Sequence, residues 1–195
     1  MSEEIRSALG YGPEWRERGF VDEAFLRAQG EQFRSGVDPN AEHYRYGAFL
    51  RFLDRTEPMD REQIDRYCAL AARDPNPAMS GSALVALLAS PAVPVSEVRR
   101  LQATAQCSAP FLQKVALRRT LLEELATGPP SDALVARCLE SGDATVQLRL
   151  LETEGVSMET LTALAERGAN RPLRNQARVR HARLVRSRAA GAGPQ

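Results

Sequence analysis

Apolar side chains recur at every third or fourth position along most of the chain, which is the spacing of amphipathic helices. Strict alternation of apolar and polar residues is rare, and β-branched residues are sparse. Prolines and glycines lie between the periodic segments, where helices should end. The pattern predicts helices over residues 3–9, 20–35, 40–54, 60–73, 78–89, 95–106, 110–126, 131–140, 144–154, 157–167 and 172–188.

Two of these helices begin with a capping signal. Ser131 is followed directly by Asp132, and Ser157 has Glu159 in the next turn. A serine at the N-cap accepts a hydrogen bond from a free backbone N–H group, and an acid in the first turn interacts favourably with the helix dipole. We therefore expect Ser131 and Ser157 to cap the helices that follow them.

The helices repeat in pairs, because the second helix of each pair aligns on an apolar anchor residue. The anchors are Tyr44, Met79, Leu112, Val146 and Leu173. They are separated by 35, 33, 34 and 27 residues, and a period of this size is typical of helical repeats. The residues four positions after the anchors are Ala48, Ala83, Ala116, Leu150 and Ala177. A small residue there lets a neighbouring helix approach closely.

One unit carries a family resemblance. The segment from Leu70 to Leu88, LAARDPNPAMSGSALVALL, is similar to the bacterial HEAT-repeat pattern of a helix, an Asp-Pro-x-Pro turn and a helix that begins apolar-Arg-x-x-Ala-Leu. The residues at the arginine position of the five units are Arg45, Ser80, Gln113, Gln147 and Arg174. Two of the five units therefore keep the arginine, and the chain resembles HEAT-like repeat proteins over roughly residues 20–188.

The resemblance implies an all-α, right-handed α-solenoid of about five HEAT-like helical pairs. We expect a single domain over residues 1–188, with an N-terminal cap over 1–19 and repeats over 20–188, followed by a disordered tail over 189–195. In HEAT-like arrays the second helices line the concave surface, so binding is expected on that surface. The fold by itself does not specify a function.

Aromatic residues are concentrated in the first third of the chain. Ten of the 11 lie between Tyr11 and Tyr67, and only Phe111 follows them. We expect Tyr11, Trp15 and Phe20 to close the first layer of the core. The C-terminal part must pack with Leu, Val and Ala instead.

Composition and motifs narrow the class of function. The chain has no apolar run long enough to cross a membrane, and its acidic N-terminus is unlike a signal peptide. Cys68, Cys107 and Cys138 form no CxxC motif, which indicates reduced, buried thiols in a cytoplasmic protein. The chain also lacks GxSxG, HExxH and phosphate-binding glycine motifs. We expect no catalytic residues, no metal, no cofactor and no membrane association.

The segment YRYGAF has two interpretations. Tyr44, Ala48 and Phe49 share a helical face and should pack in the core, which leaves Arg45 and Tyr46 exposed. An exposed Tyr–Arg pair on a concave face is typical of an interaction hot spot, so both are candidate partner-binding residues. The alternative is that the segment serves only packing.

Charge is unevenly distributed. Residues 1–166 carry a net charge of −7, whereas residues 167–195 hold eight arginines and no acid. Within the basic segment, Arg174, Arg178 and Arg180 are candidate binding residues for an acidic protein or a nucleic acid. The alternative is that these arginines belong to a solvated or internally paired cap.

Arg118, Arg149 and Arg180 are separated by 31 residues each time. If the units stack, the three guanidinium groups could form a basic ladder that binds phosphates. They could equally pair with acids of neighbouring units. The acids considered are Glu123, Glu124 and Glu152.

The sequence favours a non-catalytic module that binds a protein partner on its concave face. Small HEAT-like proteins include adaptors and immunity proteins that neutralise a toxin, and the acidic body would suit a basic partner such as a nuclease toxin. The alternative is a nucleic-acid-binding HEAT-like protein that uses the Arg-rich C-terminal helices. HEAT-like alkylpurine DNA glycosylases need a basic groove, which an acidic body does not provide. A small-molecule enzyme is the third class.

Overall fold

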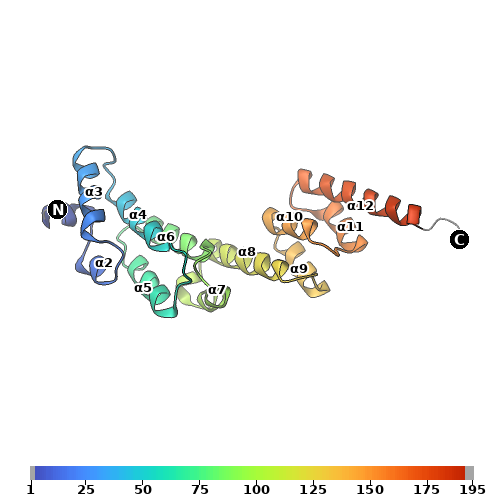
Figure 1. Ribbon diagram of the computed structural model, residues 1–195, viewed down its shortest axis with the longest axis horizontal. Coiled ribbons are helices and arrows are strands. Elements are labelled where there is room, and N and C mark those ends of the chain that lie inside the picture. Colours follow the sequence, from blue (N-terminus) through green and yellow to red (C-terminus); the bar gives the residue numbers. More distant parts are fainter. Residues whose placement is uncertain (1–2, 192–195) are drawn as a thin grey trace. The chain divides into compact units, whose positions relative to one another are not determined.

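The computed structural model describes residues 3–191, which form helices and connecting turns (Figure 1). The α-helices are α1 (Glu3–Leu9), α2 (Pro13–Glu17), α3 (Glu23–Arg34), α4 (Ala41–Leu53), α5 (Arg61–Ala71), α6 (Pro77–Ala89), α7 (Val95–Gln102), α8 (Pro110–Ala126), α9 (Asp132–Glu140), α10 (Ala144–Glu152), α11 (Met158–Arg167) and α12 (Arg171–Gly191). A short 3-10 helix, η1 (Ala105–Cys107), follows α7. The prediction of an all-α protein is confirmed for the described residues.

Side chains fix where the helices begin. The Ser131 hydroxyl accepts a hydrogen bond from the Leu134 N–H group at 3.3 Å, and the Ser157 hydroxyl accepts one from the Thr160 N–H group at 3.1 Å. Both predicted caps are therefore confirmed. A cap of this kind typically stabilises a helix by about 1 kcal/mol.

Two differences from prediction lie at the N-terminal end. The predicted turn between the first two helices contains the short helix α2, which begins with Pro13 at a position where a missing N–H group costs nothing. Helix α3 begins at Glu23 rather than at residue 20. The helix begins there because Asp22 caps it. The Asp22 carboxylate accepts a hydrogen bond from the Phe25 N–H group at 2.8 Å.

The last helix is longer than predicted. Helix α12 continues to Gly191 instead of ending at residue 188. Ala189 and Ala190 account for the extension, because alanine has the highest helix propensity. The expected disordered tail over 189–195 stays a prediction, and its residues 192–195 lie outside the described residues.

The chain forms two compact units, one up to Ala116 and one that begins at Leu117. The division lies within α8, so the first turns of that helix belong to unit 1 and the rest to unit 2. Each unit has its own cluster of buried side chains. A single uninterrupted repeat domain over residues 1–188 stays a prediction.

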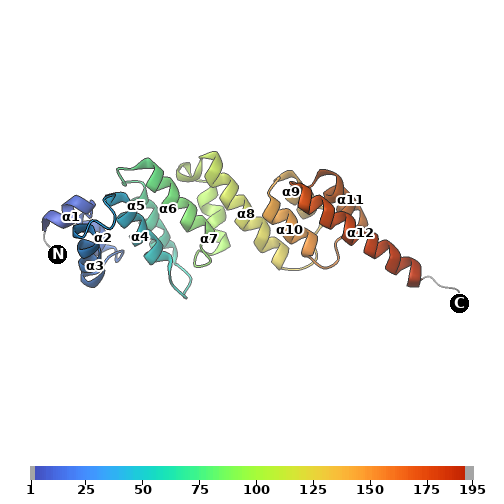
Figure 2. The ribbon, with the colours of Figure 1, turned by 90° about the horizontal axis from the view of Figure 1, so that it is seen from above.

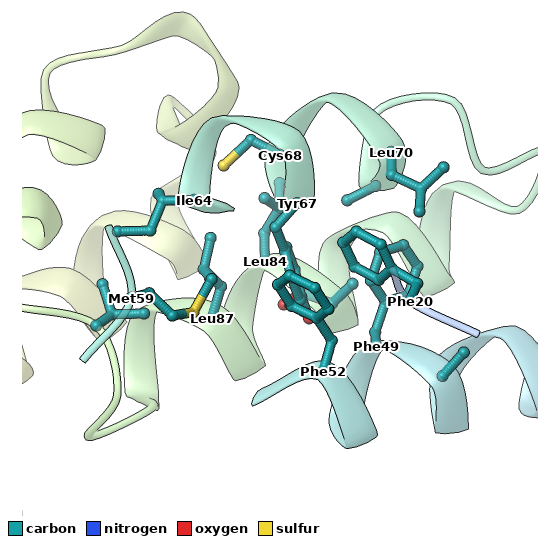
Figure 3. Packing of buried hydrophobic residues seen from close by; sticks show 14 of the residues in the cluster. Phe20, Phe49, Phe52, Met59, Ile64, Tyr67, Cys68, Leu70, Leu84 and Leu87 are labelled. Atoms are coloured by element: carbon teal, nitrogen blue, oxygen red, sulfur yellow. The ribbon is translucent and has the colours of Figure 1, made fainter. Parts of the chain in front are cut away.

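Unit 1 has an aromatic core (Figure 3). Phe20 and Phe52 stack with ring centroids 3.9 Å apart, and Phe49 lies 4.9 Å from both Tyr67 and Trp15. The buried aromatic residues are Tyr11, Trp15, Phe20, Tyr44, Phe49, Phe52 and Tyr67. The predicted burial of the first three is confirmed.

Unit 2 has an aliphatic core, as the sequence predicts. Helix α11 packs along α12, and α10 packs against α9, α11 and α12 (Figures 1 and 2). The buried residues are Leu121, Leu125, Leu134, Cys138, Val146, Leu150, Leu151, Val156, Leu161, Leu164, Leu173 and Ala177. The packing of Leu, Val and Ala expected for this part of the chain is confirmed.

Second helices of consecutive pairs lie side by side within each unit. In unit 1, α6 packs against its predicted partner α5 and against α4. In unit 2, α10 packs against α9 and lies beside α12. Ala48, Ala83 and Ala177 have no exposed surface, as expected for the small-residue position. The outward faces of neighbouring second helices therefore form a shared surface in each unit.

Candidate protein-interaction surfaces

The second-helix face of unit 1 has a hollow of about 530 Å³, called here the Phe111 hollow. It is lined by Tyr46 from α4, Phe111 from α8, and Pro77, Ala78, Gly81, Ser82 and Val85 from α6. None of these side chains is charged. The hollow can therefore accept an apolar side chain without stripping water from a charge.

Gly81 makes room for the exposed ring of Phe111. A Cβ atom at Gly81 would lie 3.2 Å from Cζ of Phe111 and would crowd the ring. Glycine in a helix interior costs roughly 0.5–1 kcal/mol relative to alanine. The space that it opens lets Phe111 lie across α6 with 51% of its surface exposed. Tyr46, a predicted site residue, is half-buried on the wall of the same hollow.

Arg45 is buried, so the expectation that it is exposed is wrong. Its Nε and Nη2 atoms donate to the two carboxylate oxygens of Asp74 at 2.8 and 3.1 Å, and its Nη1 atom donates to the Leu9 carbonyl at 3.1 Å. Arg45 is 5% exposed, and the Asp74 side chain is fully buried. Asp74 precedes α6, so this ion pair joins consecutive helical pairs. Packing of the apolar face of α4 carries Arg45 inward, where the carboxylate neutralises it.

In two other units a glutamine occupies the repeat position of Arg45 and has a related structural role. Gln113 Nε2 donates to two backbone carbonyls that precede α8, both at 2.8 Å. Gln147 Nε2 donates to the Leu139 carbonyl at 3.1 Å, and its Oε1 atom accepts from the Ala169 N–H group at 2.8 Å. These bonds satisfy backbone groups of the turns, which would otherwise lack partners.

Arg118, Arg149 and Arg180 have three different environments. Arg118 Nε donates to Asp143 at 2.7 Å, and Arg180 Nη2 donates to the Thr153 carbonyl at 3.0 Å. Arg149 is exposed, with no side-chain hydrogen bond or ion pair within residues 3–191. Partial burial raises the pKa of Asp143, but hydrogen bonds from Arg118 and from the first turn of α10 outweigh it and hold that pKa below its usual value.

Two of the three acids proposed as partners of that ladder pair with other arginines. Glu123 lies 3.3 Å from Arg119, and Glu124 lies 2.6 Å from Arg137. Glu152 is exposed on α10 and lines a hollow beside α12. Intramolecular pairing therefore holds for Glu123 and Glu124, but with arginines outside the ladder.

Two further candidate arginines lie on α12. Arg174 Nη1 donates to the Gly168 carbonyl at 2.7 Å, where it closes the turn before the helix. Arg178 is exposed, and its Nη1 atom donates to the Asn175 side chain at 2.9 Å on the same helix. Arg174 therefore has a structural partner, whereas Arg178 faces solvent.

Unit 2 has a groove on its own second-helix face, called here the α10–α12 groove. It consists of two hollows of about 390 and 220 Å³, which share Gln176. Leu148, Leu151 and Val179 supply apolar surface, and Arg180 and Arg183 line one end. Leu148 is 38% exposed and Val179 is 52% exposed.

The exposed apolar residues of both surfaces were not predicted from the sequence. Phe111 directly precedes its anchor residue, Leu148 follows its anchor by two positions, and Val179 follows its anchor by six. On a helix these positions point away from the buried anchor face. An apolar residue at such an outward position is the signal for an exposed apolar surface. Comparison of these positions across the repeats would have identified the three residues.

The three cysteines are buried and unpaired. Burial raises the pKa of Cys68 to about 12 and that of Cys138 to about 11, and it also raises the pKa of Cys107. The thiols are therefore neutral at physiological pH and pack as small apolar groups. Among the described residues, no group of three or more His, Cys, Asp or Glu side chains could hold a metal ion.

Comparisons with known protein families, curated proteins and solved structures give no match for this chain. In the part of the chain that the structure describes, every helix is too short or too polar to cross a membrane. Function is therefore inferred from the two surfaces on the second helices.

Proposed function

We propose that the protein is a non-catalytic protein-binding module built of HEAT-like repeats, and that its partner docks on the Phe111 hollow. The observation that carries this proposal is the exposed ring of Phe111, which lies over Gly81 in an uncharged hollow. Aromatic residues in well-formed apolar hollows are typical of interaction hot spots. The partner inserts an apolar side chain between Tyr46 and Phe111.

The energetics favour such an insertion. Complete burial of a Phe side chain is worth roughly 1.5–3 kcal/mol, so covering the exposed half of Phe111 contributes about 1 kcal/mol. The side chain that the partner inserts contributes a similar amount. Both gains are available because no charged group of the hollow must be desolvated.

The assignment to HEAT-like repeats has two local supports. The turn before α6 begins with Asp74-Pro75, and Asn76 caps the helix by accepting from the Ala78 N–H group at 3.0 Å. Asp74 also binds Arg45 of the preceding pair, so the turn contributes to stacking as well as to helix initiation. We propose the right-handed solenoid for the pairs within each unit on this basis.

The more specific proposal is an adaptor or a toxin-neutralising immunity protein in the cytoplasm. The net charge of −7 over residues 1–166 favours a basic partner, because opposite charge accelerates and orients association. The three free thiols are in keeping with a reducing compartment. Co-expression with basic toxins encoded beside the gene tests this form, which predicts a stable complex and protection of the host cell.

The test of the binding site is capture from native lysate with nuclease present, followed by mass spectrometry. We expect a protein that the wild type retains and that both Phe111→Asp and Gly81→Leu lose, because the first puts a charge in the hollow and the second fills it. Val37→Asp is the matched control, since Val37 is 74% exposed and does not line the hollow. Equal capture by all variants contradicts the proposed site. Recovery that disappears with nuclease would instead indicate nucleic-acid binding.

A further inference from the structure

The α10–α12 groove combines an apolar floor with unneutralised positive charge. Leu148 and Val179 expose apolar surface between two helices that lie side by side. Val179, Arg183 and Arg186 are four and three residues apart, so they lie on one face of α12. Arg183 and Arg186 are both exposed.

The arginines of α12 whose side chains the structure describes have no carboxylate partner. The chain contains no acidic residue from Arg167 to its last residue. Within the described residues, none of the arginines from Arg171 to Arg186 forms an ion pair with a carboxylate. Among the described residues that line the two hollows, the only acid is Glu152, on the α10 side. The groove is therefore basic along the α12 side and acidic at one point on the other.

We propose that the α10–α12 groove binds a short amphipathic helix of an acidic partner protein. Apolar side chains of that helix, three and four residues apart, cover Leu148 and Val179, while its carboxylates pair with Arg183 and Arg186. Glu152 repels the acidic row and so orients it toward α12. This inference does not depend on the Phe111 hollow, and it gives the protein a second surface of different chemistry.

The geometry favours an acidic helix over a nucleic acid. Phosphate binding gains affinity from the number of free cationic groups, and Arg174 and Arg180 already donate to backbone carbonyls. An apolar floor between two helices adds nothing to a phosphate contact. It does bury the apolar face of an incoming helix, and the adjacent arginines select the partner by charge.

Selection of peptides from a random display library on the immobilised full-length chain tests the proposal. We expect enrichment of peptides that have a net negative charge and apolar residues at helical spacing. A labelled enriched peptide then serves as the probe in a titration against purified variants. A single-stranded oligonucleotide is titrated in parallel as the competing class of ligand.

Four variants test whether the peptide binds in the α10–α12 groove. Val179→Asp and the double variant Arg183→Glu/Arg186→Glu should each weaken peptide binding about tenfold or more, which is the effect of removing one hot-spot contribution. Glu152→Gln should tighten binding roughly twofold or more, a gain that misfolding cannot mimic. Arg27→Glu reverses one charge at an exposed residue of unit 1, away from the groove, and should have no effect.

Each outcome of the selection and the titration either supports or overturns the proposal. Loss in the two groove variants, together with tighter binding by Glu152→Gln, supports the proposal. Failure of the selection to enrich any peptide, enrichment without acidic bias, or equal binding by Val179→Asp overturns it. Binding of the oligonucleotide that depends on Arg183 and Arg186 but not on Val179 also overturns it and assigns the arginines to phosphate recognition.

Discussion

The Arg45–Asp74 pair allows a quantitative test of how consecutive helical pairs are held together in unit 1. The guanidinium and the carboxylate meet through two hydrogen bonds of 2.8 and 3.1 Å in a site where both side chains are almost fully buried. Arg45→Met removes the positive charge and keeps most of the side-chain volume. Asp74 then retains one hydrogen bond, from the Asn76 N–H group at 2.9 Å.

The expected loss is large because it leaves a buried charge uncompensated. Removal of one partner from a buried ion pair typically costs roughly 3–5 kcal/mol, whereas replacement of both partners by uncharged groups costs far less. The double variant Arg45→Met/Asp74→Asn keeps an oxygen that can accept from the Asn76 N–H group but leaves no buried charge. Its loss should therefore be smaller than that of Arg45→Met alone.

Urea unfolding followed by far-UV circular dichroism measures these differences in the free energy of unfolding. Arg51→Met is the control, because Arg51 lies on the same helix and forms its ion pair with Asp22 at the solvent-exposed surface. It should lose much less than Arg45→Met. The proposed role of the pair is refuted if Arg45→Met costs less than about 1 kcal/mol, or if the double variant loses as much stability as Arg45→Met alone.

Three further predictions concern unit 2 and the thiols. The usual pKa of Asp143 is 3.8 and its folded value is lower, so its ion pair with Arg118 stabilises the protein above the usual pKa, and this stability is lost as the pH falls through the folded value. The advantage of wild type over Asp143→Asn in urea titrations should therefore shrink as the pH falls below about 4. Ser157→Ala should cost about 1 kcal/mol and Leu150→Ala roughly 2–5 kcal/mol in the same assay, and equal losses would contradict the assigned cap and core roles. A thiol reagent should label no cysteine of the native protein at neutral pH and all three after denaturation, while rapid native labelling would show that burial does not protect them.

Much of the fold was predictable because its signals are local. Prolines and glycines between periodic segments located the helices, and Ser131 and Ser157 cap helices as expected. Helix α2 was missed because five residues are too few to show a period. The concentration of aromatic residues before Tyr67 correctly indicated an aromatic core for the first unit.

The candidate sites depend on contacts between residues that are distant in sequence, and the sequence predicted these contacts less well than it predicted the helices. Arg45 was expected to be exposed, but its partner Asp74 lies 29 residues away and only packing brings the two together. Tyr46 does lie on a surface hollow, yet the aromatic side chain opposite it comes from α8. Periodicity identifies the face that is buried but not which outward positions of separate helices meet.

The unequal distribution of aromatic residues has a practical consequence for measurement. Trp15 and all four tyrosines belong to unit 1, and unit 2 contains no aromatic residue. Intrinsic fluorescence and near-UV circular dichroism therefore report on unit 1 alone. If unit 2 loses its structure first, these signals stay unchanged while the far-UV signal falls, so a midpoint taken from tryptophan emission would describe only unit 1.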